Sequence, residues 1–257
     1  MDFCGHYFGH IYGGKEAALN KYIADLHFYD ENILKSDGRQ CFHSIDAMNL
    51  HMIHQWNQYV STKDIVYVIG DLFTHQTTAA QANAVLQQLK GRICLIEGNH
   101  DYKWLNTPGV NTRRFEWVKI QTYVWESRKR TVLLNHYPIL FFGNNHGKDQ
   151  DGGLKMYMMH GHVHNGPENQ LLTAFEQTAQ QRYITTIKGQ QEPMTCNLIN
   201  CFCEFSDYIP LTLNQWIILR NHDYQINKCR DLIFPQTTED GAFDLQELTI
   251  GSFLQRR

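Results

Sequence analysis

The chain has 257 residues and a formal net charge of −3 at pH 7, and 42% of its residues are apolar against 19% charged. This is the composition of a globular protein, not of a disordered or fibrous one, and the near-neutral balance argues against a protein whose main task is to grip a long nucleic-acid backbone. The apolar runs are too short to span a bilayer, and the amino-terminal residues lack the order of a secretory signal. We therefore expect a cytoplasmic protein without a membrane partner.

Short apolar runs alternate with helical patterns along much of the chain. The runs are partly β-branched and predict buried strands at residues 22–24, 65–69, 93–96, 132–134 and 156–159. Apolar side chains at three- and four-residue steps predict helices over residues 45–60 and 82–89. Strand–helix–strand alternation is typical of a layered α/β fold.

The later part of the chain is less regular. Residues 118–125 and 131–135 predict a β-hairpin, and residues 198–205 predict a last strand before a short helix that begins near Leu211. Residues 165–193 are rich in glutamine, with a helical pattern in their first half.

Two further stretches indicate additions to a core. Residues 143–153 have the glycine and asparagine content of a flexible loop, and the periodicity fades after Asn221. No linker composition divides the chain, so we expect residues 1–257 to form a single domain with a carboxyl-terminal extension after residue 220.

Polar side chains gather just after each predicted strand. In chain order they are Asp25-Leu26-His27, Gly70-Asp71, Glu97-Gly98-Asn99-His100-Asp101, His136, and His160-Gly161-His162-Val163-His164. Ligands of open α/β sheets bind at the carboxyl ends of the strands. The five groups are therefore expected to meet at one edge.

The residue types in these groups indicate a metal site. Two aspartates, one asparagine and four or five histidines, without cysteine, form an oxygen and nitrogen set suited to Mn²⁺, Fe or Zn²⁺. One ion takes about four to six ligands, so seven candidates fit two ions that share a bridging carboxylate. A single strand-end histidine is more often structural, but all five groups in this order are difficult to explain as accident.

Together these motifs resemble the calcineurin-like metallophosphoesterase superfamily. The series consists of DLH (25–27), GD (70–71), GNHD (98–101), His136 and GHVH (161–164). Further matches to a bacterial and phage branch of small phosphoesterases are HFYDENIL after Asp25, Arg39 with Phe42, Asn57 before Val60, HYP at 136–138 and DYIPLTL at 207–213. The resemblance covers roughly residues 22–213.

The resemblance implies a four-layer α/β/β/α sandwich and assigns roles to individual residues. It makes Asp25, His27 and His164 ligands of one metal ion, Asn99, His136 and His162 ligands of the other, and Asp71 the bridge. His100 matches a non-ligating histidine beside the scissile phosphate, with Asp101 behind it, and these two are the expected catalytic residues.

The implied activity is that of a dinuclear metal-dependent phosphoester hydrolase, a phosphodiesterase or phosphatase, in which a hydroxide between the metals is the nucleophile. Mn²⁺ is the expected ion, with Fe or Zn²⁺ as alternatives. Two rival functions remain: a phosphomonoesterase or nucleotide hydrolase with the same site, and a scaffold that has lost catalysis and binds a protein partner. No ligand is missing, which speaks against the scaffold.

Two residues depart from the family pattern. Thr74 stands where the family often has an acidic residue, three positions after the GD aspartate. Asp30 stands where the branch usually has a second histidine, so a contact just outside the metal site is expected to differ.

Other residues are candidates for contact with a phosphoester substrate. Asn32 and Arg39 could reach the substrate or brace the loop after His27, and His146 could touch the substrate or be exposed. Residues 113–130 carry a net charge of +4 with interleaved aromatic rings. They keep a nucleic acid or nucleotide open as substrate, although a solvated hairpin face explains such charges more often. The sequence leaves the oligomeric state open.

Overall fold

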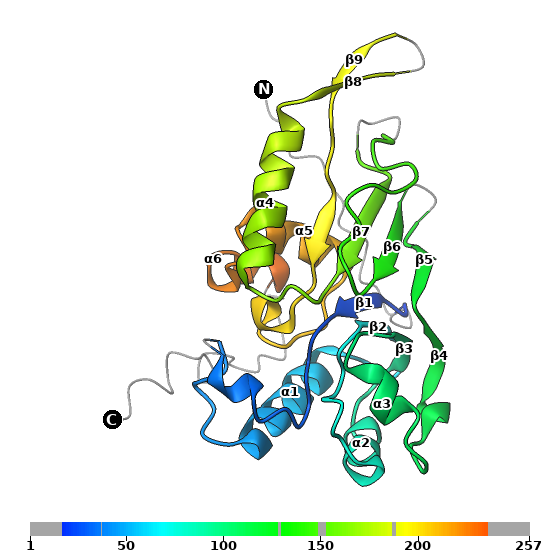
Figure 1. Ribbon diagram of the computed structural model, residues 1–257, viewed down its shortest axis with the longest axis vertical. Coiled ribbons are helices and arrows are strands. Elements are labelled where there is room, and N and C mark those ends of the chain that lie inside the picture. The colour runs from blue at the N-terminus through cyan, green and yellow to red at the C-terminus, as the bar shows by residue number, and fades with distance from the viewer. Residues whose placement is uncertain (1–16, 37, 128–129, 149–152, 187–188, 236–257) are drawn as a thin grey trace.

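The computed structural model describes residues 17–36, 38–127, 130–148, 153–186 and 189–235. Two four-stranded sheets pack face to face, and helices cover their outer faces (Figure 1). The result is the expected four-layer α/β/β/α sandwich. In this described part of the chain, no helix is long and apolar enough to cross a membrane.

The first sheet contains four parallel strands in the order of the chain. They are β1 (Asn20–Ile23), β2 (Ile65–Ile69), β3 (Arg92–Ile96) and β4 (Phe115–Lys119). Because both faces of the central strands β2 and β3 are covered, these two strands are almost continuously apolar, as is usual for parallel sheets. The predicted strands at 65–69 and 93–96 are confirmed.

The second sheet has the order β10-β7-β6-β5. Its strands are β5 (Gln121–Trp125), β6 (Thr131–Asn135), β7 (Met156–His160) and β10 (Leu198–Asn200). Only β5 runs antiparallel to its neighbour within this sheet. A separate two-stranded hairpin, β8 (Tyr183–Thr185) with β9 (Gln191–Pro193), projects from the body of the molecule (Figure 1).

The described residues form six α-helices, and three of these helices begin at a side-chain cap. The six helices are α1 (Ile45–Tyr59), α2 (Ala79–Leu86), α3 (Asp101–Leu105), α4 (Pro167–Gln180), α5 (Leu213–Asn221) and α6 (Ile226–Ile233). The side chain of Ser44 accepts a hydrogen bond from Ala47 N at the start of α1, and Thr78 with Gln81 forms a capping box at the start of α2. The helices predicted over 45–60 and in the first half of 165–193 are confirmed, whereas α6 lies where the periodicity had faded.

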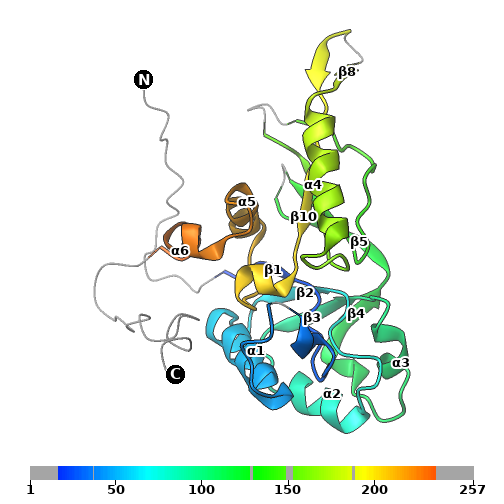
Figure 2. The ribbon, with the colours of Figure 1, turned by 60° about the vertical axis from the view of Figure 1, so that its left-hand side comes forward.

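Alternating side chains of each central strand pack into two different hydrophobic cores, one on each face of the sheet. Val66 and Val68 of β2 face α1 and α2, while Tyr67 and Ile69 face the second sheet. On the far side of the second sheet, Leu133, Met158 and Leu198 pack against α4. Figure 2 shows α4 and the pair α1–α2 on opposite sides of the sheets.

The hairpin predicted from residues 118–125 and 131–135 is only half right. Residues 121–125 do pair with β6, but β4 ends at Lys119 and belongs to the other sheet. The chain passes from one sheet to the other at Ile120, where no glycine, proline or asparagine marks a turn. The last predicted strand, 198–205, is also too long: β10 ends at Asn200 and a 3₁₀ turn follows at Cys203–Ser206.

Candidate metal centre

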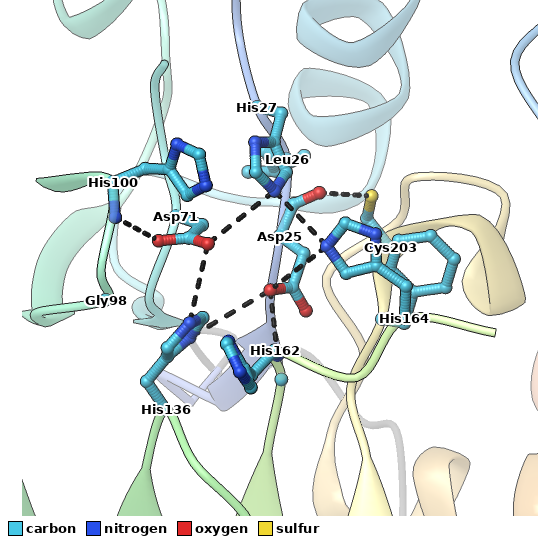
Figure 3. Close-up of polar contacts among 12 residues, drawn as sticks. Asp25, Leu26, His27, Asp71, Gly98, His100, His136, His162, His164 and Cys203 are labelled. Carbon is cyan, nitrogen blue, oxygen red and sulfur yellow. Dashed lines mark hydrogen bonds and ion pairs between the residues drawn. The ribbon is translucent and has the colours of Figure 1, made fainter. Parts of the chain in front are cut away.

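The polar groups after β1, β2, β3, β6 and β7 meet at the carboxyl ends of both sheets (Figure 3). Backbone hydrogen bonds hold the loops together: Asp25 N donates to Gly70 O over 3.1 Å, and His27 N donates to Asp71 O over 2.9 Å. In the second sheet, Gly161 N donates to His136 O over 3.0 Å. The expected convergence at one edge is therefore present.

The chain turns sharply as it enters this site. The backbone has a left-handed conformation, with φ between 47° and 71°, at Asp25, His27, Asp71, His162 and His164. Such residues cost of order 1–3 kcal/mol each and persist where the surroundings hold them, most often at functional sites.

Asp25, His27 and His164 form the first group of candidate ligands. The Nε2 atoms of His27 and His164 lie 3.2 Å apart, and Asp25 Oδ1 lies 3.7 Å from His164 Nε2. Burial lowers the pKa of both histidines, that of His164 to about 3 with a further contribution from His27. Both rings are therefore neutral at pH 7, and each can offer a nitrogen lone pair to a cation.

Asn99, His136 and His162 form the second group. Asn99 Oδ1 lies 3.0 Å from His136 Nε2 and 2.9 Å from His162 Nδ1. His136 Nδ1 lies 3.0 Å from the carbonyl oxygen of Ile69, which fixes a proton on Nδ1 and directs Nε2 into the site.

Asp71 lies between the two groups. Its Oδ2 is 3.6 Å from His27 Nε2 and 3.4 Å from His136 Nε2, while its Oδ1 accepts a hydrogen bond from His100 N over 2.9 Å. Burial alone would raise the pKa of Asp71, but the hydrogen bond and charge of His136 lower it to about 2. The carboxylate is thus ionised and faces both groups.

The donor set fits divalent cations. Asp25 is completely buried, its Oδ2 has no hydrogen-bond partner, and burial raises its pKa to about 7, so its charged form needs a cation close by. Burial also disfavours the charged form of His136, yet Asp71 and Asp25 raise its pKa to about 9. A metal ion that binds this ring would therefore have to displace a proton. Within the described residues, three overlapping sets could hold an ion: Asp25–His27–His164, His27–Asp71–His100 and Asp25–Asp71–His136.

Two glycines leave space for the carboxylates of Asp71 and Asp25. A Cβ atom at Gly98 would lie 2.3 Å from Asp71 Oδ1, and one at Gly161 would lie 2.4 Å from Asp25 Oδ2. Any larger residue at either position would displace a candidate ligand, so the glycines in the GNHD and GHVH motifs provide space for the carboxylates.

Asp30 supports the first group from outside. Its Oδ2 lies 3.4 Å from His27 Nδ1, the ring nitrogen that points away from the site. A carboxylate in this position orients a ligating histidine and raises its basicity. The departure from the branch pattern at Asp30 therefore replaces one polar contact with a charged one.

His100 lies beside the candidate ligands at the start of α3. Its ring packs edge-on to that of His27, with centroids 5.0 Å apart, and its Nδ1 is buried without a hydrogen-bond partner. The exposed His75 lies 5.7 Å away, ring centroid to ring centroid, and was not expected from the sequence. The assignment of His100 as a non-ligating residue stays a prediction, because its ring also lies within ligating reach of the groups around Asp71.

Asp101 does not have the place expected of a catalytic residue. It is completely buried, and its carboxylate accepts hydrogen bonds from Asp71 N, Leu72 N, Gly98 N and Trp104 Nε1. These bonds fix the backbone of two ligand loops rather than the ring of His100. Asp101 is therefore a positioning residue, and the prediction of a catalytic role is wrong.

Arg39 braces the site and does not face a substrate. Its guanidinium is fully buried, donates to the carbonyl oxygens of Asp25 and Leu26, and pairs with Glu204 over 2.7 Å. Of the two roles considered for Arg39, the structure supports the second. Asn32 is exposed close to Asp30, and its contact with substrate stays a prediction.

His146 lies at the wrong end of the second sheet. Its Nδ1 is 3.0 Å from Thr195 Oγ1, and Thr195 precedes β10, at the amino end of the parallel strands. The metal centre is at their carboxyl end. The loop between β6 and β7 runs back to the start of β7, so the prediction that His146 contacts substrate is wrong.

The fold and the site together are those of the metallophosphoesterase superfamily. The chain matches the calcineurin-like phosphoesterase family over residues 22–223, and it belongs to that family. The match covers all seven candidate ligands.

Two relatives match parts of this chain, and their names carry no activity. An uncharacterized protein of Methanocaldococcus jannaschii is 43% identical over 79 residues, and the Gene 66 protein of Mycobacterium phage D29 is 29% identical over 138 residues. These regions amount to 31% and 45% of this chain, and the chain spans 44% and 65% of the length of the two relatives.

A solved structure has a similar fold. The crystal structure of a protein of unknown function from Aquifex aeolicus superposes with a TM-score of 0.52 at 21% sequence identity, covering 77% of this chain and 97% of the other. At this identity the likeness extends to the fold alone.

Proposed function

We propose that the protein is a dinuclear metal-dependent phosphoester hydrolase. The observation that carries this proposal is the place of Asp71, whose Oδ2 lies within 3.6 Å of both His27 Nε2 and His136 Nε2. One carboxylate between two ligand groups is the arrangement that a shared pair of ions requires.

The residues that would hold the ions follow from the two groups. Asp25, His27 and His164 would bind one ion, Asn99, His136 and His162 the other, and Asp71 both. When bound, divalent ions acidify a water molecule toward neutral pH and offset charge on the phosphoryl oxygens. Mn²⁺ is the ion we propose first, since the carboxylate and amide oxygens suit it; the imidazole ligands make Fe and Zn²⁺ the alternatives.

His100 would serve the departing group. A leaving alkoxide needs a proton, and the ring of His100 lies beside the site with no hydrogen-bond partner at Nδ1. Its backbone N–H already holds Asp71 Oδ1, and Asp101 fixes the turn from Gly98. The ring is thus anchored on one side while its polar atoms remain available.

The geometry favours a phosphodiester over a phosphomonoester. Asn99 and Tyr137 are exposed on one side of the site and His162 is half-buried, which leaves room for a phosphate with two substituents. The basic segment at residues 113–130 gives little support for a nucleic-acid substrate. Arg114 is used inside the fold, where it donates to the carbonyl oxygens of Leu86, Leu89 and Gly91.

The test is hydrolysis of matched aryl monoesters and diesters by protein reconstituted with Mn²⁺. We expect a higher kcat/KM for the diester. A clear preference for the monoester would overturn the substrate class and leave the metal centre intact. No hydrolysis of either ester by protein with both ions bound would favour the scaffold function.

A further inference from the structure

Tyr137 places an aromatic ring at the edge of the second ligand group. The ring packs edge-on against His162 and His136, with centroids 4.5 Å and 5.2 Å apart. Its side chain is nevertheless 47% exposed, although Tyr137 directly follows the candidate ligand His136. A large ring whose only task is to support two ligands would stabilise the protein more if it were covered, because removing apolar surface from water is favourable. The open part of the ring can therefore meet a molecule bound at the site.

The backbone around Tyr137 holds this ring in one place. Tyr137 N donates to Asn135 Oδ1 over 2.8 Å, and Asn135 Nδ2 donates to Gln121 Oε1 over 3.2 Å. Pro138 follows and restricts the backbone of Tyr137 to extended conformations. A tyrosine side chain loses little conformational entropy when it makes a contact, because it has few rotatable bonds. A ligand that meets Tyr137 thus finds a preorganised surface, which favours binding.

His100 and Tyr137 contact different ligand groups. His100 packs against His27 of the first group, with centroids 5.0 Å apart, whereas Tyr137 packs against the second group. The carboxylate of Asp71 lies between the two groups, and Figure 3 shows His100 and His162 on opposite sides of it. A phosphodiester has two substituents, and His100 would serve the one that departs. The substituent that stays on phosphorus is then left for the side of Tyr137.

The rings on this side favour an aromatic substituent. The loop that begins at Tyr137 carries a second exposed ring, Phe141, which is 66% exposed and packs edge-on against Phe175 of α4. Aromatic rings prefer offset-stacked or edge-on contacts with one another, and these contacts add to the benefit of removing apolar surface from water. A small alkyl group would cover little of the exposed ring of Tyr137. An aryl group would cover much more of it.

We propose that Tyr137 is the specificity-determining residue for the substituent that stays on phosphorus, and that this substituent is aromatic. The proposal rests on the proposed function and narrows its substrate class to phosphodiesters that retain an aryl group. In the alternative, Tyr137 only holds His136 and His162 in position, and its removal would affect every substrate equally.

Two diesters with the same leaving group test this proposal in the Mn²⁺-loaded full chain. In methyl 4-nitrophenyl phosphate and phenyl 4-nitrophenyl phosphate, water adds to phosphorus, the bond to 4-nitrophenolate breaks, and methyl or phenyl phosphate remains. We expect the unchanged chain to prefer the phenyl ester. Tyr137→Ala should lower kcat/KM for the phenyl ester about threefold to tenfold, mainly through KM, and change that for the methyl ester less than about twofold. Equal losses on both esters would overturn the proposal.

Two further variants separate recognition from support of the metal centre. Tyr137→Phe keeps the ring and should retain the preference for the phenyl ester; a loss as large as that of Tyr137→Ala would contradict a contact through the ring. Tyr123→Ala is the matched control, because Tyr123 is 50% exposed and pairs with Leu133 within the second sheet. It should change neither ester. Elemental analysis should find the metal content of the unchanged chain in all three variants, and loss of metal in Tyr137→Ala would instead support the alternative.

Binding of inert analogues gives a measurement without turnover. Dimethylphosphinate and diphenylphosphinate each carry one negative charge and have no ester bond to hydrolyse. In calorimetric titrations, Tyr137→Ala should weaken the binding of diphenylphosphinate about threefold to tenfold and leave that of dimethylphosphinate unchanged. This result in a chain that hydrolyses neither ester would overturn the proposed function and support the aryl contact of Tyr137. Hydrolysis of both esters with unchanged phosphinate binding in Tyr137→Ala would overturn the role of Tyr137 alone.

Discussion

Two loops of similar composition lie at opposite ends of the second sheet, but only the loop at the carboxyl end contributes candidate metal ligands. At the carboxyl end, GHVHNG (161–166) brings two histidines to Asp25 and Asn99. At the amino end, GNNHG (143–147) brings one histidine to Thr195, a neutral hydroxyl. Glycine and histidine content alone therefore does not make a metal site. The direction of the strands does, because it decides which loops meet.

The largest expected difference between the two ends is in metal binding. Asp71→Ala removes the carboxylate that faces both ligand groups, so the metal content should fall from about two ions per chain to none. Elemental analysis after Mn²⁺ loading and dialysis measures this directly. At the amino end, Glu192→Ala should leave both ions in place. Retention of one ion in Asp71→Ala would show that the two groups bind independently.

The next difference is in catalysis. His100→Ala should keep both ions and lower kcat by roughly 10²–10⁴-fold, the usual contribution of a proton donor. The loss should shrink for an ester with a good leaving group, since such a group departs without a proton. His146→Ala should leave kcat within about twofold. Equal losses for good and poor leaving groups would exclude His100 as the donor.

One glycine in each loop allows the two ends of the sheet to be compared by adding a single methyl group. In Gly161→Ala the new methyl group would collide with Asp25, so the affinity for Mn²⁺ should fall about 10- to 100-fold, as for other changes just outside a metal site. A Cβ atom at Gly143 meets nothing within 4 Å. Gly143→Ala should therefore bind Mn²⁺ like the unchanged chain, which calorimetric titration would measure.

The smallest effect concerns stability at the amino end. Lys148 Nζ and Glu192 Oε2 lie 2.9 Å apart, with both side chains about one-third exposed. Lys148→Ala should lower the free energy of unfolding by less than about 1 kcal/mol, because solvent screens such pairs. Urea unfolding measures the change. A loss several times larger would mean that this loop contributes more to the fold than its contacts indicate.

Much of the site could be predicted because its signals are local. The central strands are apolar runs that end at a glycine or polar cluster, as Ile65–Ile69 ends at Gly70 and Asp71. Parallel strands then bring those ends together without further information. A layered α/β fold follows from strands that are apolar on both faces, whereas the four-layer arrangement is what the resemblance to the family implies.

Other features depend on contacts that no local pattern records. The step between sheets at Ile120 was missed because Val118 and Tyr123, on either side of it, are both apolar. The bracing role of Arg39 depends on Glu204, 165 positions away. His146 was misplaced because the composition of a loop does not reveal which end of the sheet it occupies.

A cavity between α1, the 3₁₀ turn at Cys203–Ser206 and α6 was missed for a similar reason. Asp207 and Tyr208 belong to a stretch that the resemblance marks as a family feature, but the cavity that they line forms only when α1 and α6 pack around them, and Tyr208 Oη is left there without a hydrogen bond. A sequence shows which groups are polar. It does not show which of them lack a partner after folding.

The pairing of β1 also determines how much of the chain must be synthesised before the core can be completed. Ala24 N donates to Cys201 O, and Tyr22 forms a β-bridge with Leu211, so the first strand is completed by the last part of the core. A ribosome must release residue 211 before the strand that leads to Asp25 has its final neighbours. The candidate metal centre is therefore completed late in biosynthesis, and a chain truncated before residue 201 should expose the carboxylate of Asp25 without the backbone that positions it.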